Sequence, residues 1–170
     1  EIEKDPYNDC AFYNMGLLYY EMKMYDKSEE AFNNAIEINP FDECTFNNLG
    51  MLYSYINNYE KSEEAYKNAI KINPKHAKAF YNMGKLYSHM NKFIDSEKAY
   101  KNAIEINPNY AESFYNLGLL YYNANKYTES EEAYKKAIEI NPNDAQSFYN
   151  LGVLYSDINK NEESEKSYKR

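Results

Sequence analysis

The chain has 170 residues, a formal net charge of −8, a mean hydropathy of −0.88 and 44% hydrophobic residues, enough to form a buried core. The hydrophobic residues are spread along the chain, and no run approaches the roughly 18 apolar residues that a membrane span needs. Lysines interleave with glutamates, whereas nucleic-acid-binding proteins carry basic patches. We therefore expect neither a membrane nor a nucleic acid as partner.

The start of the sequence and the two cysteines indicate the cellular location that we expect. The sequence opens without a charged, then apolar, then small-residue leader, so no secretory signal is visible. Cys10 and Cys44 lie 34 residues apart, and equivalent points on packed helices are separated by roughly 8–10 Å. A disulfide needs Cα atoms within about 7 Å, so we expect two free thiols and an intracellular setting, cytoplasmic or nuclear.

Every glycine and every proline recurs at a spacing of 34 residues. The five glycines are Gly16, Gly50, Gly84, Gly118 and Gly152, and the five prolines are Pro6, Pro40, Pro74, Pro108 and Pro142. The stretch FYNLGLLYY at 114–122 occurs five times with edits. Such a period indicates an array of stacked repeats rather than a single globular fold.

The repeats divide the chain into segments. With the glycine at position 8 and the proline at position 32, four complete repeats cover 9–42, 43–76, 77–110 and 111–144. Residues 1–8 match the tail of a preceding repeat, and 145–170 form a truncated fifth repeat. Because neither end carries a recognisable cap, we expect the chain to be a window cut from a longer array.

Each repeat predicts two helices. Hydrophobic spacing at i, i+3, i+4 and i+7 marks the first helix, in the first repeat through Phe12, Met15, Gly16 and Tyr19. The second helix has its face on Tyr25, Ser28, Phe32, Ala35 and Ile36. Short polar turns, such as 57–58 and 125–126, separate the two helices, and Asn-Pro ends the second. The fold class is therefore all-α, a solenoid of helical hairpins.

This pattern resembles the tetratricopeptide repeat (TPR) family along the whole chain. The family has a large aromatic residue at position 4, Leu at 7, Gly at 8, Tyr at 11, Ala at 20, an aromatic residue at 24, Ala at 27 and Pro at 32. The third repeat supplies Phe80, Met83, Gly84, Tyr87, Tyr100, Ala103 and Pro108 at matching positions. The resemblance implies stacked helix–turn–helix repeats that form a right-handed superhelix.

Two departures from the family pattern stand out. Position 20 is serine in every repeat, as Ser28, Ser62, Ser96, Ser130 and Ser164. We expect each hydroxyl to bond the carbonyl four residues back in its own helix. In the fifth repeat Asn161 replaces the aromatic residue at position 17, so we expect this hairpin to be the loosest.

No catalytic or metal constellation stands out. His76 and His89 occupy unrelated repeat positions without a carboxylate or thiol at ligand spacing. Each glycine stands alone inside a helix, which excludes a phosphate-binding loop, and the position-20 serines have no histidine partner. Glu131 and Glu132 precede Lys135 and Lys136 by four residues, which predicts ion pairs on a solvated helix face. We expect no enzymatic activity, no cofactor and no metal.

Positions 2, 5, 6, 9, 12 and 13 of the first helix gather opposite the core positions 4, 7, 8 and 11, and the resemblance implies that they line a concave groove. Position 6 is asparagine throughout, as Asn14, Asn48, Asn82, Asn116 and Asn150. A carboxamide donates and accepts, so this asparagine ladder suits the backbone of an extended peptide. It resembles the ladder of O-linked N-acetylglucosamine transferases and the asparagines of the peroxisomal targeting-signal receptor. Repeat duplication and codon bias also account for a recurring asparagine.

Further candidates for peptide contact lie on the same side. They are the position-5 tyrosines Tyr13, Tyr81, Tyr115 and Tyr149, together with Lys78 and Lys85. The tyrosines favour an interface, although they also suit packing between repeats. A clamp for a C-terminal carboxylate, as in chaperone adaptors of the family, needs more basic groups than the two lysines, so this is the weaker interpretation.

Three hypotheses about function follow. The first is a non-catalytic scaffold that holds a protein or peptide segment in the groove. The second is the substrate-recruiting region of a larger enzyme such as a glycosyltransferase, and the third is a self-associating structural subunit. We also expect weak, salt-promoted end-to-end association, in which a surface with Phe12, Leu18 and Tyr19 meets one with Tyr155 and Tyr168.

Overall fold

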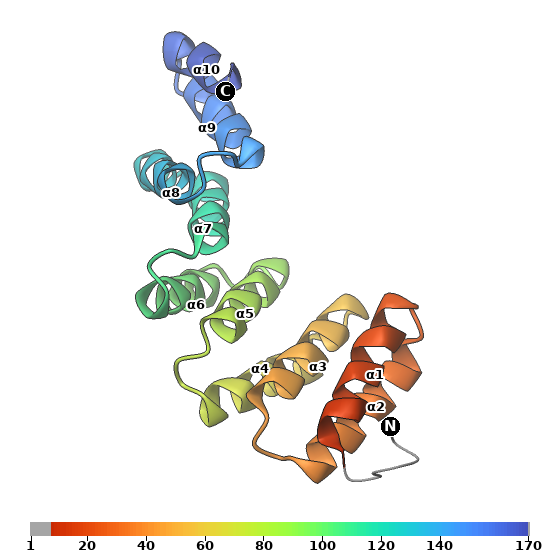
Figure 1. Ribbon diagram of the computed structural model, residues 1–170. Helices are drawn as coiled ribbons and strands as arrows, with labels where there is room; N and C mark the ends of the chain where they lie inside the picture. The colour runs from red at the N-terminus through yellow and green to blue at the C-terminus, as the bar shows by residue number, and fades with distance from the viewer. Residues whose placement is uncertain (1–7, 170) are drawn as a thin grey trace. The chain divides into compact units, whose positions relative to one another are not determined.

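A computed structural model of the chain describes residues 8–169, and these residues form ten helices and no strand (Figure 1). The helices are α1 (Asp9–Glu21), α2 (Tyr25–Ile38), α3 (Glu43–Tyr55), α4 (Tyr59–Ile72), α5 (Ala77–His89), α6 (Phe93–Ile106), α7 (Ala111–Asn123), α8 (Tyr127–Ile140), α9 (Ala145–Asp157) and α10 (Asn161–Tyr168). The predicted repeat tail at 1–8 lies outside the described residues except for Asn8. The all-α prediction is confirmed.

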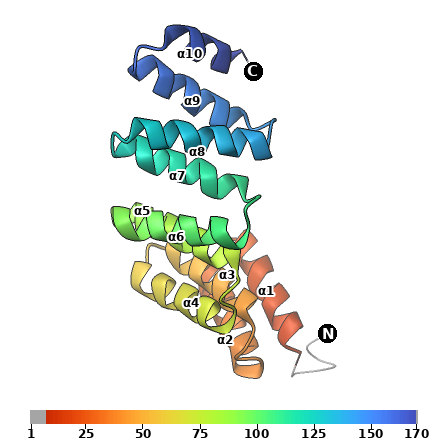
Figure 2. The ribbon, with the colours of Figure 1, turned by 90° about the vertical axis from the view of Figure 1, so that its left-hand side faces the viewer.

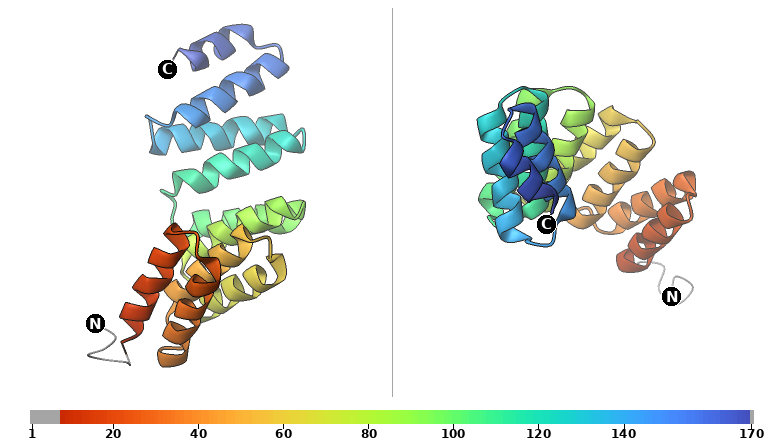
Figure 3. Two further views of the ribbon diagram at one scale, coloured as in Figure 1. Left: turned by 90° about the vertical axis from the view of Figure 1, so that its right-hand side faces the viewer. Right: turned by 90° about the horizontal axis from the view of Figure 1, so that it is seen from above.

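The chain forms two compact units, residues 1–86 and 87–170, whose boundary falls inside α5. In the first unit α1 packs on α2, α2 on α3, and α3 on α4 (Figure 3). In the second unit α7 packs on α8, α8 on α9, and α9 on α10 (Figure 2). Each unit is therefore a short stack of helical hairpins, and the first helices of adjacent hairpins also touch.

The glycine at position 8 lets the two helices of a hairpin come together. A Cβ atom on Gly50 would lie 2.7 Å from the Tyr66 ring, and one on Gly118 would lie 2.8 Å from the Tyr134 ring. Both rings are almost fully buried, at 2% and 1% exposed, and neither has room to move aside. A larger residue at position 8 would push the hairpin apart.

The serine at position 20 bonds a different carbonyl from the one predicted. Its hydroxyl donates across the hairpin to the carbonyl of the position-8 glycine, 12 residues earlier, and not to the carbonyl four residues back. The pairs are Ser28–Gly16 at 2.8 Å, Ser62–Gly50 at 2.7 Å, Ser130–Gly118 at 2.8 Å and Ser164–Gly152 at 2.8 Å. The prediction was wrong because the close glycine contact brings a second acceptor within reach.

The turns inside the hairpins and between them follow the sequence signals. Position 15 has φ between 56° and 61° in every repeat, through Lys23, Asn57, Asn91, Asn125 and Asn159. Asparagine tolerates this left-handed conformation, and Lys23 is the exception. Asn39 ends α2 in an extended conformation before Pro40, as predicted, and its side-chain Oδ1 accepts from the N–H of Phe41 at 3.2 Å.

In most repeats the residue at position 34 caps the first helix of the following repeat. The side chains of Asn8, Asp42 and Asp144 accept hydrogen bonds from backbone N–H groups of α1, α3 and α9. The Nδ1 atom of His76 accepts from the N–H of Ala79 at 3.3 Å, which gives this histidine a structural position at the start of α5. At α7 the residue is Tyr110, whose side chain makes no capping hydrogen bond.

Candidate functional site

Two of the asparagines at position 6 bond a tyrosine of the preceding repeat. Asn48 Nδ2 donates to the Tyr13 hydroxyl at 2.9 Å, and Asn150 Nδ2 donates to the Tyr115 hydroxyl at 2.9 Å. In both cases the acceptor is the position-5 tyrosine of the preceding repeat. The two sets of residues that the sequence nominated separately therefore come together as hydrogen-bonded pairs on the first-helix side of each unit.

The other three asparagines have different surroundings. Asn82 is 8% exposed and donates to Asn47 Oδ1 at 2.9 Å, because position 5 is asparagine in the second repeat. Asn116 Nδ2 donates to the carbonyl of Glu112 in its own helix at 2.8 Å. Asn14 is exposed. The predicted ladder is thus not uniform in its hydrogen bonding or its exposure.

The position-5 tyrosines pack against the position-24 ring of their own repeat. The Tyr115 and Tyr134 ring centroids are 6.0 Å apart, and those of Tyr149 and Tyr168 are 5.8 Å apart. Packing by the ring leaves the hydroxyl of Tyr115 to accept from the next repeat, and Tyr149 is 61% exposed. One side chain therefore serves both as a packing element and as a surface group.

The two candidate lysines lie seven residues apart on α5, which places them on the same side of the helix. Lys78 is exposed, and the Lys85 ammonium lies 5.7 Å from the centroid of the Tyr81 ring. This is a cation–π distance. The position-5 tyrosine of this repeat thus has a basic neighbour that Tyr13 and Tyr115 do not share at the equivalent position.

The same side of the first unit carries a tyrosine cluster, formed by Tyr20, Tyr25 and Tyr55. Ring centroids lie 6.1 Å (Tyr20–Tyr25), 5.8 Å (Tyr20–Tyr55) and 5.1 Å (Tyr25–Tyr55) apart. A hydrogen bond with Tyr55, together with burial, raises the pKa of Tyr25 to about 12. Tyr55 is 56% exposed, so the cluster forms an aromatic surface that is open to solvent.

The second unit is acidic at the equivalent place. The Tyr122 hydroxyl donates to the Asp157 carboxylate, which stands where the first unit has Tyr55. This hydrogen bond, together with burial, raises the pKa of Tyr122 to about 12. Asp157 is exposed. The two units therefore offer different chemistry at positions 12 and 13, aromatic in one and acidic in the other.

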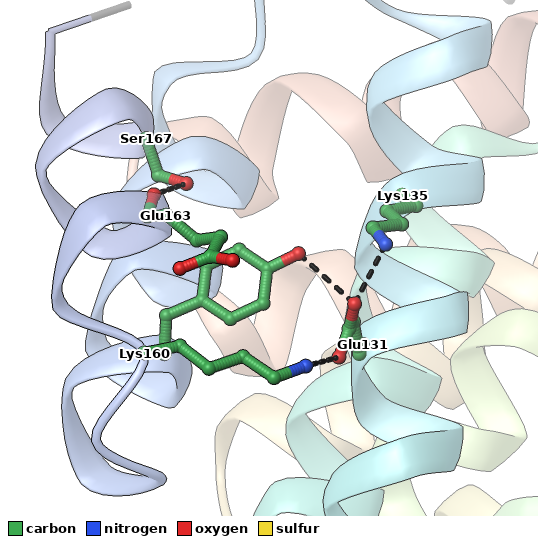
Figure 4. A network of polar contacts seen from close by, with 6 residues as sticks. Glu131, Lys135, Lys160, Glu163 and Ser167 are labelled. Carbon is green, nitrogen blue, oxygen red and sulfur yellow. Dashed lines mark hydrogen bonds and ion pairs between the residues drawn. The ribbon is translucent and has the colours of Figure 1, made fainter.

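On the second-helix side, Glu131 is the centre of a polar network between the last two repeats (Figure 4). It accepts from Lys135 of its own helix at 2.6 Å and, from the next repeat, Lys160 at 3.2 Å and the Tyr155 hydroxyl at 3.0 Å. The Lys160 ammonium also lies 5.4 Å from the Tyr155 ring centroid. Burial raises the pKa of Glu131, but these hydrogen bonds outweigh it and hold the pKa below its usual range.

Three predictions about this region are corrected. The Glu131–Lys135 pair is confirmed, but the Glu131 side chain is only 19% exposed and so does not lie on a solvated face. Lys136 pairs with Glu139 at 2.6 Å instead of Glu132. Tyr155, expected to lie open at the end of the array, is 6% exposed because its ring packs on the preceding repeat.

The tyrosine–glutamate contact recurs between the first two repeats, where the accompanying lysine occupies a different repeat position. Tyr53 donates to Glu29 at 2.7 Å, and the accompanying lysine is Lys61, at position 19. In the last repeat the lysine is Lys160, at position 16. Sequence reasoning missed this network, although a signal exists. Repeats with an acidic residue at position 19 have lysine at position 16, through Lys92, Lys126 and Lys160.

Comparison with protein families decides the identity. Models of the tetratricopeptide repeat match residues 10–42, 44–76, 77–110 and 111–144, and a further tetratricopeptide repeat model matches 133–166. The chain belongs to the tetratricopeptide repeat family. The resemblance drawn from the glycine, tyrosine and proline positions is thereby confirmed. No curated protein sequence matches this TPR chain.

Solved structures share the TPR fold at low identity. A crystal structure of MamA is 24% identical with a TM-score of 0.82, and the match covers 91% of each chain. Pseudomonas aeruginosa pilF is 18% identical with a TM-score of 0.88, over 95% of this chain and 73% of that one. YrrB, described as "a TPR protein with an unusual peptide-binding site", is 19% identical with a TM-score of 0.74, over 98% and 86%. These similarities establish the fold.

A recess lies on the second-helix side of the first unit of this TPR chain. It has a volume of about 250 Å³, with Ile36, Phe46 and Leu49 among its apolar walls and Asn33 and Asn68 among its polar ones. Position 25 is Asn33 in this first repeat and lysine in the next three. The recess is thus a concave surface apart from the position-6 asparagines.

The remaining candidate chemistry is limited. Cys10 and Cys44 are free, as predicted, and both are exposed. The Asp9 carboxylate raises the pKa of the Cys10 thiol, and partial desolvation raises the pKa of the Cys44 thiol. Within residues 8–169 no three His, Cys, Asp or Glu side chains gather as a metal site. None of the described helices has the length and hydrophobicity to cross a membrane.

Proposed function

We propose that this TPR chain is a non-catalytic scaffold whose first helices bind an extended segment of a protein or peptide partner. The observation that carries the proposal is the Asn–Tyr pair, Asn48 with Tyr13 and Asn150 with Tyr115. In each pair the asparagine uses one N–H on the tyrosine, which leaves its carboxamide oxygen as an acceptor. The tyrosine oxygen accepts that bond and keeps its own hydrogen to donate. One acceptor beside one donor matches the N–H and C=O of a peptide backbone.

Within each unit, the spacing of adjacent repeats suits an extended chain. Neighbouring helices pack about 8–10 Å apart, and an extended backbone advances by about 3.3 Å per residue. Equivalent groups on successive repeats therefore meet every third residue of the bound segment. The asparagine ladder binds the backbone of the segment, and the partner residues between these contacts can therefore vary.

Selectivity comes from the positions beside the ladder. In the first unit, Leu17 and the tyrosine cluster favour apolar and aromatic partner side chains. In the second unit, Asp157 favours a basic side chain. YrrB, similar in structure, is described as having a peptide-binding site, which supports a binding role for the fold. A substrate-recruiting region of a larger enzyme would use the same surface, and the experiment below tests it equally.

The test is a screen of the 170-residue chain against a library of unrelated extended peptides, followed by calorimetric Kd values for those that bind. Asn48→Ala and Asn150→Ala each remove a backbone contact. We expect both to weaken unrelated peptides alike, by about 1–3 kcal/mol. Asn33 is an exposed residue of α2 at the second-helix recess. Asn33→Ala is therefore the matched control, and we expect it to leave Kd unchanged.

Unfolding in urea accompanies each Kd, because Asn48→Ala and Asn150→Ala also lose a bond between repeats. A loss of affinity at conditions where the variant is fully folded belongs to the ladder. If Asn33→Ala weakens binding and the ladder variants do not, the recess is the binding site and the ladder assignment is wrong. If no peptide in the library binds, the proposed function is wrong.

A further inference from the structure

We propose that the recess on the second-helix side of the first unit binds a lysine side chain of a protein partner. Residues of α2, α3 and α4 line this recess, which has a volume of about 250 Å³. Pockets for small molecules measure about 300–1,000 Å³, so the recess suits a single side chain. Its described lining contains no position-6 asparagine, so the inference stands apart from the proposed peptide binding.

The residue at position 25 of the first repeat is unusually short for this chain. It is Asn33 here and lysine in the next three repeats, through Lys67, Lys101 and Lys135. Each of these lysines donates at 2.6 Å to the glutamate four residues earlier, and Figure 4 shows this for Lys135 and Glu131. Asparagine has one methylene group where lysine has four, so the first repeat lacks the long stem that the others carry.

The recess lies where that stem lies in the second unit. There the Lys101 ammonium and the Tyr121 hydroxyl donate to the same oxygen of Glu97, at 2.6 Å and 2.9 Å. The lysine side chain therefore extends from position 25 toward position 11 of the next repeat. Asn33 and Tyr53 occupy these two positions in the first unit, and both line the recess. A place that the chain's own lysine takes in one unit is thus open to a partner's lysine in the other.

The glutamate beside the recess also has one cation fewer than its equivalent. Glu131 binds two lysines, one on each carboxylate oxygen. Glu29 binds one, Lys61, on Oε1 at 3.1 Å, and among residues 8–169 its Oε2 has no hydrogen bond or ion pair. The Glu29 side chain is 28% exposed, against 19% for Glu131. Its second oxygen is therefore available to an incoming ammonium group.

The lining combines apolar walls with a negative charge. Ile36 and Leu49 are among the apolar walls, which suit the methylene groups of a lysine stem. Lys61 has Glu29 as its counter-ion. Glu64, which also lines the recess, is exposed and forms no ion pair or hydrogen bond with another described residue. The charge left without a counter-ion is thus a carboxylate, and a cation is its complement.

NMR titration of the isotope-labelled 170-residue chain with Nα-acetyl-lysine amide, at constant ionic strength, tests the site. We expect saturable shifts at the amides of Ile36, Leu49 and Ala65, with a Kd of about 1–10 mM. Nα-acetyl-norleucine amide has the same stem without the ammonium group, and it should bind at least about tenfold more weakly. Equal affinity for the two probes would mean that the recess takes an apolar side chain, and would overturn the proposal.

Two substitutions at position 25 exchange the open and the filled recess. Asn33→Lys restores the lysine of the other repeats, which the fold accommodates three times, and should abolish the shifts at Ile36 and Leu49. Lys101→Asn opens the equivalent place in the second unit, where Glu132 stands at the position of Glu64. This variant should gain saturable shifts at the amides around Glu132. The spectrum of each variant also shows directly that it is folded.

A matched pair of glutamate variants separates the recess from the overall negative charge. Glu64→Gln removes the charge in the lining and should raise Kd at least about fivefold. Glu30 occupies the same repeat position, is exposed and does not line the recess, so Glu30→Gln changes the net charge equally and should leave Kd unchanged. Binding that survives in Asn33→Lys, or equal losses in the two glutamine variants, would overturn the proposal.

Discussion

The junction between the first two repeats and the junction between the last two, one in each unit, share the same set of hydrogen bonds. We call this set the frame. It consists of Asn48–Tyr13 and Tyr53–Glu29 at the first junction, and Asn150–Tyr115 and Tyr155–Glu131 at the last. Donor and acceptor positions are identical in both. The same frame thus recurs at these two junctions, one in each unit.

The residues around the frame differ between the two junctions. Tyr20 contacts the ring of Tyr55 in the first unit, and Tyr122 donates to Asp157 in the second. The lysine beside the buried tyrosine also comes from a different position. The comparison shows that stacking depends on one set of positions and surface chemistry on another. A TPR array can thus vary its surface chemistry without changing how it stacks.

The largest expected effect comes from adding one methyl group at the position-8 glycine, where the two helices of a hairpin meet. Gly118→Ala places a Cβ against the Tyr134 ring, which is 1% exposed and has no room to move. Gly152→Ala places one 2.6 Å from Tyr168, which is 50% exposed and so has solvent into which its ring can shift. We expect Gly118→Ala to lower the free energy of unfolding by about 2–3 kcal/mol. Gly152→Ala should lower it by less than about 1 kcal/mol, since alanine also favours the helix.

Urea unfolding of both glycine variants, followed by circular dichroism, measures this difference. Equal losses in the two variants would mean that the position-24 ring does not limit the hairpin contact. Close approach to that ring would then no longer account for glycine at position 8.

The sequence predicted the parts of the fold that a single helix determines. The 34-residue period, the hydrophobic spacing and the Asn-Pro pairs were sufficient for the hairpins and their ends. The prediction from sequence failed for hydrogen bonds whose acceptor lies on a different helix. The Ser130 hydroxyl was expected to bond within α8, but it reaches Gly118 on α7. That acceptor is present only after the two helices have packed.

The candidate site shows the same division. Asn48 and Tyr13 were both nominated from their recurrence, but their bond spans 35 residues, one period plus one position. This offset depends on how adjacent repeats are displaced, which no pattern within one repeat reveals. Glu131 was read as a surface residue because helical spacing shows Lys135 but does not show Tyr155 from the next repeat.

The first turns of α7 and α9, both in the second unit, differ in whether a buried serine hydroxyl has a hydrogen-bond partner. Ser147 donates to the capping Asp144, whereas the equivalent Ser113 follows Tyr110 and its buried hydroxyl has no partner among the described residues. A buried hydroxyl without a partner is destabilising. Ser113→Ala should therefore raise the free energy of unfolding by about 1 kcal/mol, and Ser147→Ala should lower it by a similar amount.

Alanine already occupies this position in the first and third repeats, as Ala11 and Ala79, so the site accommodates it. Thermal and urea unfolding of the two variants give the sign directly. A loss of stability in Ser113→Ala equal to that in Ser147→Ala would show that the Ser113 hydroxyl does have a partner in solution.

The smallest expected effect concerns Tyr122 and Asp157, the acidic counterpart of the tyrosine cluster. The hydrogen bond to Asp157 raises the pKa of Tyr122 to about 12 in the folded chain, against about 10 in the unfolded chain. A raised tyrosine pKa contributes stability that is complete below about pH 10 and is lost as pH rises through about 12. The pair lies near the surface, where solvent screens it, so the contribution is a few tenths of a kcal/mol.

Two substitutions separate this contribution from that of the first unit, where the pKa of Tyr25 is also about 12. Tyr122→Phe removes the titrating group, and Asp157→Asn removes the charge that raises its pKa. The free energy of unfolding of each variant, subtracted from that of the wild type, should give a difference that declines between about pH 10 and pH 12. Tyr25 titrates in all three proteins and cancels in the subtraction. A difference that stays constant across this range would mean that Asp157 does not raise the pKa of Tyr122.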